Sequence, residues 1–459
     1  MRRLHGALTA LTLAVAAPAG AAEISRVVSS GEPGSPFSMD IDVRWDRSVE
    51  NATITREKGS ASTASIPGGA VFQGDRLDYT RTRNAIVPRI AIGLWQDLEA
   101  HFELPYVLGD DRELQYGTLY GKPTGPGTDS ISTNTIDAQG QPCTTTQPCP
   151  LFPVPSAGYH GGKVGDLKAG LAWAVFNDRK DDTKPTWVLG MDLTAPTAAR
   201  WEPGKNRTAD WESPFSAKTT PGPFGEKFWK WDLYTVLSKR YKYVDPYLKA
   251  HAQFAFKSAS TYSNCDAVNE ANSATVQQMN TDAGSGTNHG ITGVNNCQSW
   301  GDEAGAQLPF VAGLMFGTEI VPYEDAREGQ KVTIDLRLYS ELTGKSRFYN
   351  ELSDATGKIL QTGEYMEIGG LAGLYLRASK YVQLKAQATF ATRTAHDLTG
   401  ESLGKNGSTP ALDPSGNGRT LDPTQMNPNY DWRWDAPGRR FRISEVSVFE
   451  LSFGAALMF

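Results

Sequence analysis

Hydrophobic and polar residues alternate with a period of two along many short segments of this 459-residue chain. In the segment SMDIDVRWD, residues 38–46, the apolar residues Met39, Ile41 and Val43 take one face and charged residues take the other. The same pattern returns in residues 330–342 and 381–393. Because successive side chains of a β-strand point to opposite faces, this pattern predicts strands with one apolar and one polar face.

Twelve segments of this kind are recognisable, and short and long connections join them in regular alternation. Such alternation is typical of an antiparallel up-and-down β-barrel of the bacterial outer membrane, with tight periplasmic turns and large extracellular loops. We therefore predict an all-β transmembrane barrel of about twelve strands. The strands are expected near 37–46, 84–95, 98–107, 164–176, 187–196, 228–240, 246–257, 307–321, 330–342, 364–377, 381–393 and 441–459.

The connections separate this prediction from its alternatives. A secreted β-sandwich or propeller would also show alternation, with its apolar faces turned inward. Neither fold is expected to sort its loops into two sizes or to carry charges on the second face of nearly every strand. Long loops are expected near 47–83, 108–163, 197–227, 258–306, 343–363 and 394–440, and an even strand number places both ends of the barrel on the tight-turn side.

The chain ends in FELSFGAALMF, residues 449–459. This stretch resembles the terminal assembly signal of outer-membrane barrels, with Phe453, Leu457 and Phe459 in one alternating phase. Closing the barrel would pair this strand with the first one, near 37–46. Val446 and Val448 have the opposite phase, so we expect a β-bulge near Val448 and Phe449.

The first 22 residues, MRRLHGALTALTLAVAAPAGAA, have the layout of a secretory signal peptide. A basic start precedes an apolar stretch at 7–17 and small residues at 19–22, so we expect cleavage after Ala21 or Ala22. The mature chain would then comprise a flexible periplasmic segment, 23–36, and the barrel, 37–459. No run of about 18 apolar residues follows the signal peptide, so transmembrane helices are not expected.

Charge narrows the range of partners. Loss of the signal peptide would leave 43 basic against 51 acidic residues, and a mildly acidic chain gives no reason to expect a nucleic-acid partner. The expected partners are outer-membrane lipid, the barrel assembly machinery and a small-molecule solute.

Four cysteines lie in the expected long loops. In an oxidising compartment they allow three disulfide pairings, and we favour the pairs between nearest neighbours, each of which would close one loop. Zinc binding is the alternative, but no CxxC motif is present. The disulfide candidates are Cys143, Cys149, Cys265 and Cys297.

The polar faces of the strands would line the lumen if the apolar faces meet lipid. Acidic and basic residues are nearly balanced there, which argues against an ion filter of one sign. Either the charges pair across strands and support a largely filled barrel, or opposing walls orient solutes along a polar path. The lumen-lining candidates are Asp42, Arg44, Arg89, Glu99, His101, Glu103, Lys249, Asp335, Arg337, Arg377, Lys385 and Arg393.

Three segments carry a family resemblance: PRIAIGLWQDLEAHFELPYVLG (88–109), VGDLKAGLAWAVF (164–176) and LSKRYKYVDPYLKAHAQFAF (237–256). They resemble a family of Gram-negative outer-membrane transporters associated with meta-cleavage pathways for phenol and other aromatic compounds. The resemblance implies an outer-membrane channel for small, hydrophobic or aromatic solutes.

An enzymatic function has one candidate motif, Glu99-x-His101-x-Glu103, which places two carboxylates and an imidazole on one strand face. No matching nucleophile or further ligand accompanies it, so we predict neither catalysis nor a cofactor. The alternative to a channel is a docking barrel of an envelope-spanning machine for secretion, polysaccharide export or gliding motility, with periplasmic or outer-membrane complex partners. The large loops, which exceed the needs of a simple pore, favour that alternative.

Overall fold

The computed structural model describes residues 22–31, 36–58, 71–119, 122–123, 133–134, 149–150, 152, 154–203, 207–208, 221–265, 301–325, 327–402, 404, 427–435 and 437–459. Among these residues, no helix has the length and apolar character needed to cross a membrane.

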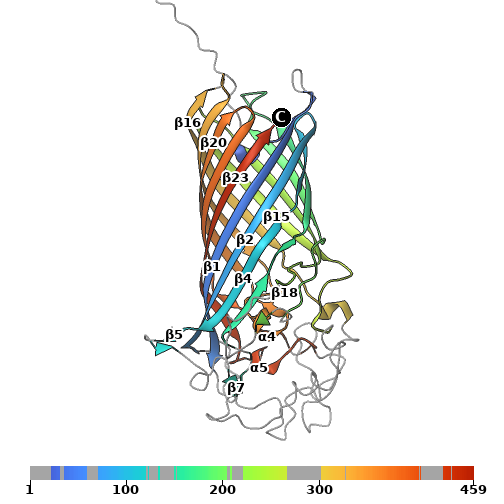
Figure 1. Ribbon diagram of the computed structural model, residues 1–459, viewed down its shortest axis with the longest axis vertical. Helices are drawn as coiled ribbons and strands as arrows, with labels where there is room; N and C mark the ends of the chain where they lie inside the picture. Colours follow the sequence, from blue (N-terminus) through green and yellow to red (C-terminus); the bar gives the residue numbers. More distant parts are fainter. Residues whose placement is uncertain are drawn as a thin grey trace, which may run out of the picture.

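Twelve antiparallel strand positions close into one barrel (Figure 1). Each strand pairs with the next along the chain, and the last pairs with the first. One position is shared by β3 and β4, which a break at residues 104–105 separates. The wall consists of β1 (Met39–Lys58), β2 (Val71–Trp95), β3 (Leu98–Glu103) with β4 (Tyr106–Tyr116), β11 (Leu167–Phe176), β12 (Thr186–Ala195), β14 (Phe228–Ser238), β15 (Val244–Lys257), β16 (Val311–Asp325), β17 (Gln330–Thr343), β20 (Tyr365–Ser379), β21 (Val382–Arg393) and β23 (Phe441–Met458).

The predicted closure between the last and first strands is confirmed. β23 pairs with β1 from Asp40 opposite Met458 onward, and the Phe459 N–H donates a 2.8 Å hydrogen bond to the Met39 carbonyl. Both barrel ends therefore lie at the short-turn side, at the top of Figure 1, opposite the long loops. In an outer-membrane barrel the short-turn side is periplasmic and the long-loop side extracellular.

Several strands are longer than we expected, and the prediction of loops over 47–58, 71–83 and 108–116 is wrong. β1, β2 and β4 continue through these residues as paired strands. The cause is a change of pattern along β1. Up to Trp45 the outer face is apolar, whereas farther on it carries polar residues such as Asn51 and Thr53, and the apolar side chains of Ala52 and Ile54 are buried on the inner face.

The bulge expected at Val448 and Phe449 is also misplaced. Both neighbours of β23 pair with these residues without a register shift. The shift lies nearer the start of β23, at Glu445, whose φ is 53°. Val446 and Val448 have the opposite phase for another reason, because they pack into an apolar cluster inside the barrel.

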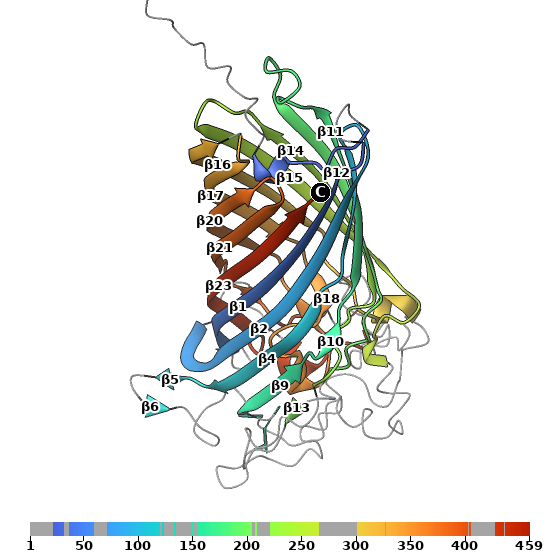
Figure 2. The same ribbon diagram turned by 45° about the horizontal axis from the view of Figure 1, so that its top comes forward.

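Smaller elements complete the structure, and most lie at the extracellular end (Figures 1 and 2). At the periplasmic end, the 3-10 helix η1 (Glu23–Ser25) lies within the ring of strands. The others are β5 (Thr118–Leu119), β6 (Lys122–Pro123), β7 (Thr133–Asn134), β8 (Cys149–Pro150), β9 (Ser156–His160), β10 (Lys163–Val164), β13 (Arg207–Thr208), β18 (Ser346–Phe348), β19 (Leu360–Thr362), β22 (His396–Asp397), η2 (Gly301–Ala304), α4 (Ser353–Thr356) and α5 (Trp432–Asp435).

Candidate functional site: the lumen and its two plugs

Loop segments fill the extracellular end of the lumen. We call residues 346–362, 396–402 and 427–435 the outer plug. Their apolar side chains, including Leu352, Leu398 and Trp434, pack against inward-facing residues of the wall such as Ile54 and Phe441. Burial of these side chains in one cluster supplies the main attraction between the outer plug and the wall.

Buried polar groups fix the outer plug internally. Arg347 forms a two-point ion pair with Glu401, and Asn427 donates a 2.7 Å hydrogen bond to the same carboxylate. The amide of Asn350 donates to the Leu398 carbonyl at 2.8 Å, which joins two of the loops. Since each of these groups has a partner, their burial is compatible with a stable plug.

The periplasmic end holds a second segment, residues 22–31, which we call the inner plug. We expected a free periplasmic stretch here, whereas the described part of it lies inside the barrel, with Ala22 and Ser25 buried. The Glu23 N–H donates to Glu319 at 2.7 Å, the Val28 N–H donates to Glu99 at 2.8 Å, and Arg26 pairs with Asp40. Backbone N–H groups of the plug thus satisfy wall carboxylates that would otherwise be costly to bury.

Two further contacts locate the inner plug on the wall. The hydroxyls of Ser25 and Ser238 lie 2.7 Å apart. A side chain at Gly93 would meet the backbone of Ser30 at 2.9 Å, so only glycine allows the plug to lie this close to β2.

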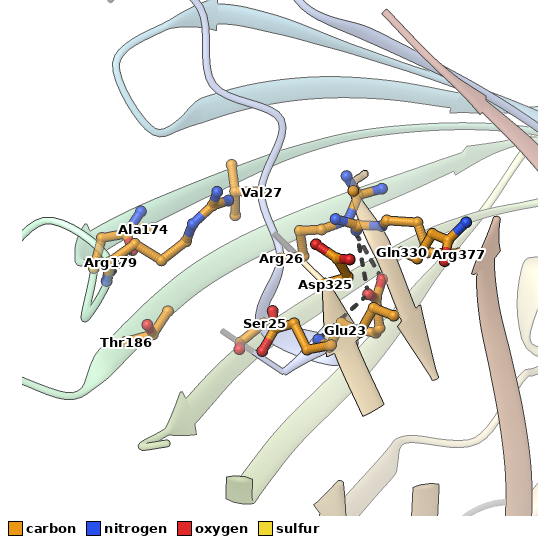
Figure 3. A pocket seen from close by; sticks show the side chains of 14 residues that line it. Glu23, Ser25, Arg26, Val27, Ala174, Arg179, Thr186, Asp325, Gln330 and Arg377 are labelled. Atoms are coloured by element: carbon orange, nitrogen blue, oxygen red, sulfur yellow. Dashed lines mark hydrogen bonds and ion pairs between the residues drawn. The ribbon is translucent and has the colours of Figure 1, made fainter. Parts of the chain in front are cut away.

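A cationic cluster surrounds Glu23 (Figure 3). Arg26 and Arg377 lie 3.5 Å from its carboxylate and Lys331 lies 4.0 Å away. Burial alone would raise the pKa of Glu23, but these cations outweigh that effect and lower its pKa to about 2. A cavity of about 190 Å³ remains beside this cluster, lined also by Asp325 and Gln330.

The predicted lumen-lining residues lie on the inner face of the wall and contact neighbouring charged or aromatic groups. Arg89 pairs with Glu99 at 2.6 Å, and Lys385 pairs with Asp42 at 2.5 Å. Three further ion pairs join Arg44 to Asp46 at 2.8 Å, His101 to Asp192 at 2.9 Å and Arg377 to Glu23 at 3.5 Å. Arg393 binds both Glu50 and Glu367 at 2.8 Å, and the Lys249 ammonium lies 4.9 Å from the ring of Tyr234. Glu103 lies opposite Arg89 on one neighbouring strand and opposite Lys168 on the other.

Asp335 is the centre of a network in which only Asp335 and Arg337 were predicted from the sequence to line the lumen. The Tyr247 hydroxyl donates to Asp335 at 2.5 Å, the Tyr375 hydroxyl at 3.0 Å and the Arg337 guanidinium at 2.6 Å. Tyr247 reaches across β16 because Gly317 leaves room for its ring, where a side chain would come within 2.3 Å. An inward glycine beside an inward tyrosine was the sequence signal that could have found this contact.

The Glu99-x-His101-x-Glu103 motif connects the inner plug to the wall. His101 lies 3.2 Å from Glu99 and 2.9 Å from Asp192, and Glu99 also accepts hydrogen bonds from Arg89 and Val28. No group of three or more potential metal ligands is present among the described residues.

Of the four disulfide candidates, Cys265 is the one whose side chain the structure describes. Cys143 and Cys297 lie outside the described residues, and Cys149 is described only in its backbone. Cys265 is buried next to Ala304. The proposed disulfide pairings stay predictions.

The outer surface of the barrel indicates which environment surrounds it. Large apolar side chains point away from the wall, with Leu338 71%, Phe316 60% and Phe390 59% exposed. Lipid is the environment that favours such an exterior, and a closed ring leaves no strand edge unpaired within it. The chain is an outer-membrane β-barrel protein. Strand ends on its periplasmic side carry the exposed rings of Trp95, Tyr241 and Tyr381, as expected at a membrane interface.

Solved outer-membrane barrels are similar to this protein over most of their length. An outer membrane channel from Pseudomonas putida F1 has 13% sequence identity and a TM-score of 0.40, covering 94% of this chain and 100% of its own. A Pseudomonas aeruginosa FadL homologue has 8% identity and a TM-score of 0.34, covering 92% and 90%. The TodX monoaromatic hydrocarbon channel has 9% identity and a TM-score of 0.31, covering 96% and 98%. No family model and no curated protein sequence matches the chain.

Proposed function

We propose that this protein is a gated outer-membrane channel for small solutes. The observation that carries the proposal is the content of the lumen: ion pairs line the inner face of the wall, and two plugs formed by segments distinct from the wall occupy its ends. Among the described residues, the inner plug contacts the wall through hydrogen bonds, ion pairs and the packing of Ile24 and Val27. Such a segment is suited to leave the lumen without unfolding the barrel.

The proposed solutes are hydrophobic or aromatic molecules. At the extracellular end, the inner face of the wall is apolar and carries the rings of Tyr79 and Phe441, and Phe152 packs 5.6 Å from Phe441. Aromatic rings favour this kind of surface because it offers stacking and apolar burial together. Farther in, tyrosine hydroxyls offer polar groups along the inner face, from the Tyr339 contact with Glu367 to the Tyr247 contact with Asp335 nearer the periplasmic end.

Planar-bilayer recordings and uptake assays test this function. The full-length protein should give brief openings, and deletion of residues 24–31 should give a larger, steadier conductance. Cells lacking the gene should take up a small monoaromatic compound more slowly than wild type and a small sugar at an unchanged rate. Absence of conductance from both proteins, together with unchanged uptake, would contradict the proposal.

The docking alternative was based on the large loops. Among their described parts, residues 346–362, 396–402 and 427–435 fold into the lumen, where they are suited to gating. This location favours the channel over a docking role. Recovery of a stoichiometric periplasmic partner on the purified barrel would favour docking instead.

A further inference from the structure

Two buried carboxylates of the wall lie beside the start of the inner plug. Asp245 in β15 and Glu319 in β16 are paired in register, and their exposed fractions are 1% and 0%. Both carboxylate oxygens of Asp245 and Oε2 of Glu319 have no hydrogen-bond partner among the described residues. Two adjacent buried carboxylates are costly to keep ionised unless a positive charge lies near them.

The neighbouring cations are paired with other acids. Arg26 pairs with Asp40, Lys331 and Arg377 face Glu23, and Arg240 pairs with Glu324 at 2.6 Å. The polar groups of the plug nearest to the two carboxylates are backbone amides: the Glu23 N–H binds Glu319 at 2.7 Å, and the Ala22 N–H lies next to Asp245. A positive charge at either amide nitrogen would therefore meet a buried carboxylate directly.

Processing of the expected signal peptide would create that charge at this position. Small residues at 19–22 predict cleavage after Ala21 or Ala22, which converts the amide of Ala22 or Glu23 into a free ammonium group. We infer that Asp245 and Glu319 form a binding site for the N-terminal ammonium of the mature chain, so that signal-peptide removal itself locks the inner plug in the barrel. This inference does not depend on transport.

The ammonium group of the purified, folded protein provides the test. Intact-mass and terminal-peptide spectrometry should give Ala22 or Glu23 as the first residue, and any other first residue would overturn the inference. An aldehyde reagent selective for N-terminal amines should then label the folded protein at least ~10-fold more slowly than the unfolded chain. Equal labelling rates would also overturn it.

A variant pair separates the ion pair from simple burial. In the double variant Asp245→Asn/Glu319→Gln, which keeps the shape of both side chains, labelling should approach the rate of the unfolded chain. The control Asp325→Asn removes a carboxylate from the cavity beside Glu23, which Asp245 and Glu319 do not line, and should remain protected. If the double variant does not assemble, Glu319→Gln alone is used, with a smaller rise expected. Protection that persists in the variant that folds would show that burial, and not the carboxylates, shields the amine.

Discussion

At the scale of single residues, Glu23 shows how the inner plug is attached. Its carboxylate is buried within 4.0 Å of three cations from two wall strands and from the plug itself. Attraction to these cations lowers the pKa of Glu23 to about 2, below its ordinary value of 4.5. The shift corresponds to about 3 kcal/mol in favour of the ionised, inserted plug.

The plug should therefore loosen in acid. The stabilisation is complete above the ordinary pKa of 4.5 and is lost as the pH falls from 4.5 towards 2, because protonation removes the negative charge. Open probability in planar bilayers should rise over this range. Glu23→Gln should raise open probability at pH 6 and flatten its pH dependence, whereas Glu324→Gln, at the same mouth, should retain the wild-type curve. Identical curves for wild type and Glu23→Gln would contradict this role.

The sequence predicted which residues line the lumen, but it did not predict which side chains they contact there. The alternation of polar and apolar residues placed His101 and Lys385 on the polar face. This assignment requires only the order of residues along one strand. Their contacts with Asp192 and Asp42 each cross an intervening strand, so they depend on registers set by the whole barrel. In the Asp335 network only the Tyr247 contact has a signal in the sequence, the glycine at position 317, and no local pattern encodes the contact between Val28 and Glu99.

At the scale of elements, the wall changes character along its length. Strand identity was predictable because apolar residues alternate wherever the outer face meets lipid. Strand length was not predictable, because beyond the bilayer the outer face becomes polar while the outer plug makes the inner face apolar. Ile54 is fully buried on the inner side of β1, and the next residue, Thr55, points outward. The pattern expected for a lipid-facing strand is therefore inverted there.

This inversion predicts opposite effects for neighbouring residues. Ile54→Asp puts an unpaired charge into the outer-plug cluster and should cost at least ~3 kcal/mol. Thr55→Asp places the same charge in water and should change stability by no more than ~0.5 kcal/mol. Heat-modifiable migration of the detergent-solubilised protein gives the melting temperature of each. Equal losses in the two variants would contradict the assignment of faces.

At the scale of the whole molecule, the pairing of β23 with β1 closes the barrel and brings both of its ends to the periplasm. Phe459 is 58% exposed, so its ring contributes little to packing within the chain. We expect this ring to contribute instead to recognition of the chain by the barrel assembly machinery.

Phe459→Ala should therefore lower the amount of folded protein in the outer membrane several-fold and leave the melting temperature of the recovered protein unchanged. Phe390→Ala, which removes a ring of 59% exposure from the extracellular half of β21, provides the control and should leave the amount unchanged. Equal amounts of folded Phe459→Ala and wild-type protein would contradict the assembly role.

The central claim is that the inner plug gates the lumen, and a reversible cross-link tests it most directly. The hydroxyls of Ser25 and Ser238 are 2.7 Å apart, close to the separation of about 2.05 Å between bonded sulfurs, so Ser25→Cys/Ser238→Cys should form a disulfide between plug and wall. Wild-type protein with and without reductant controls for the native cysteines. Cross-linked protein should show neither conductance nor uptake of the monoaromatic solute, and reductant should restore both to the wild-type level. Equal conductance and uptake before and after reduction, with the cross-link verified by mass, would contradict the claim.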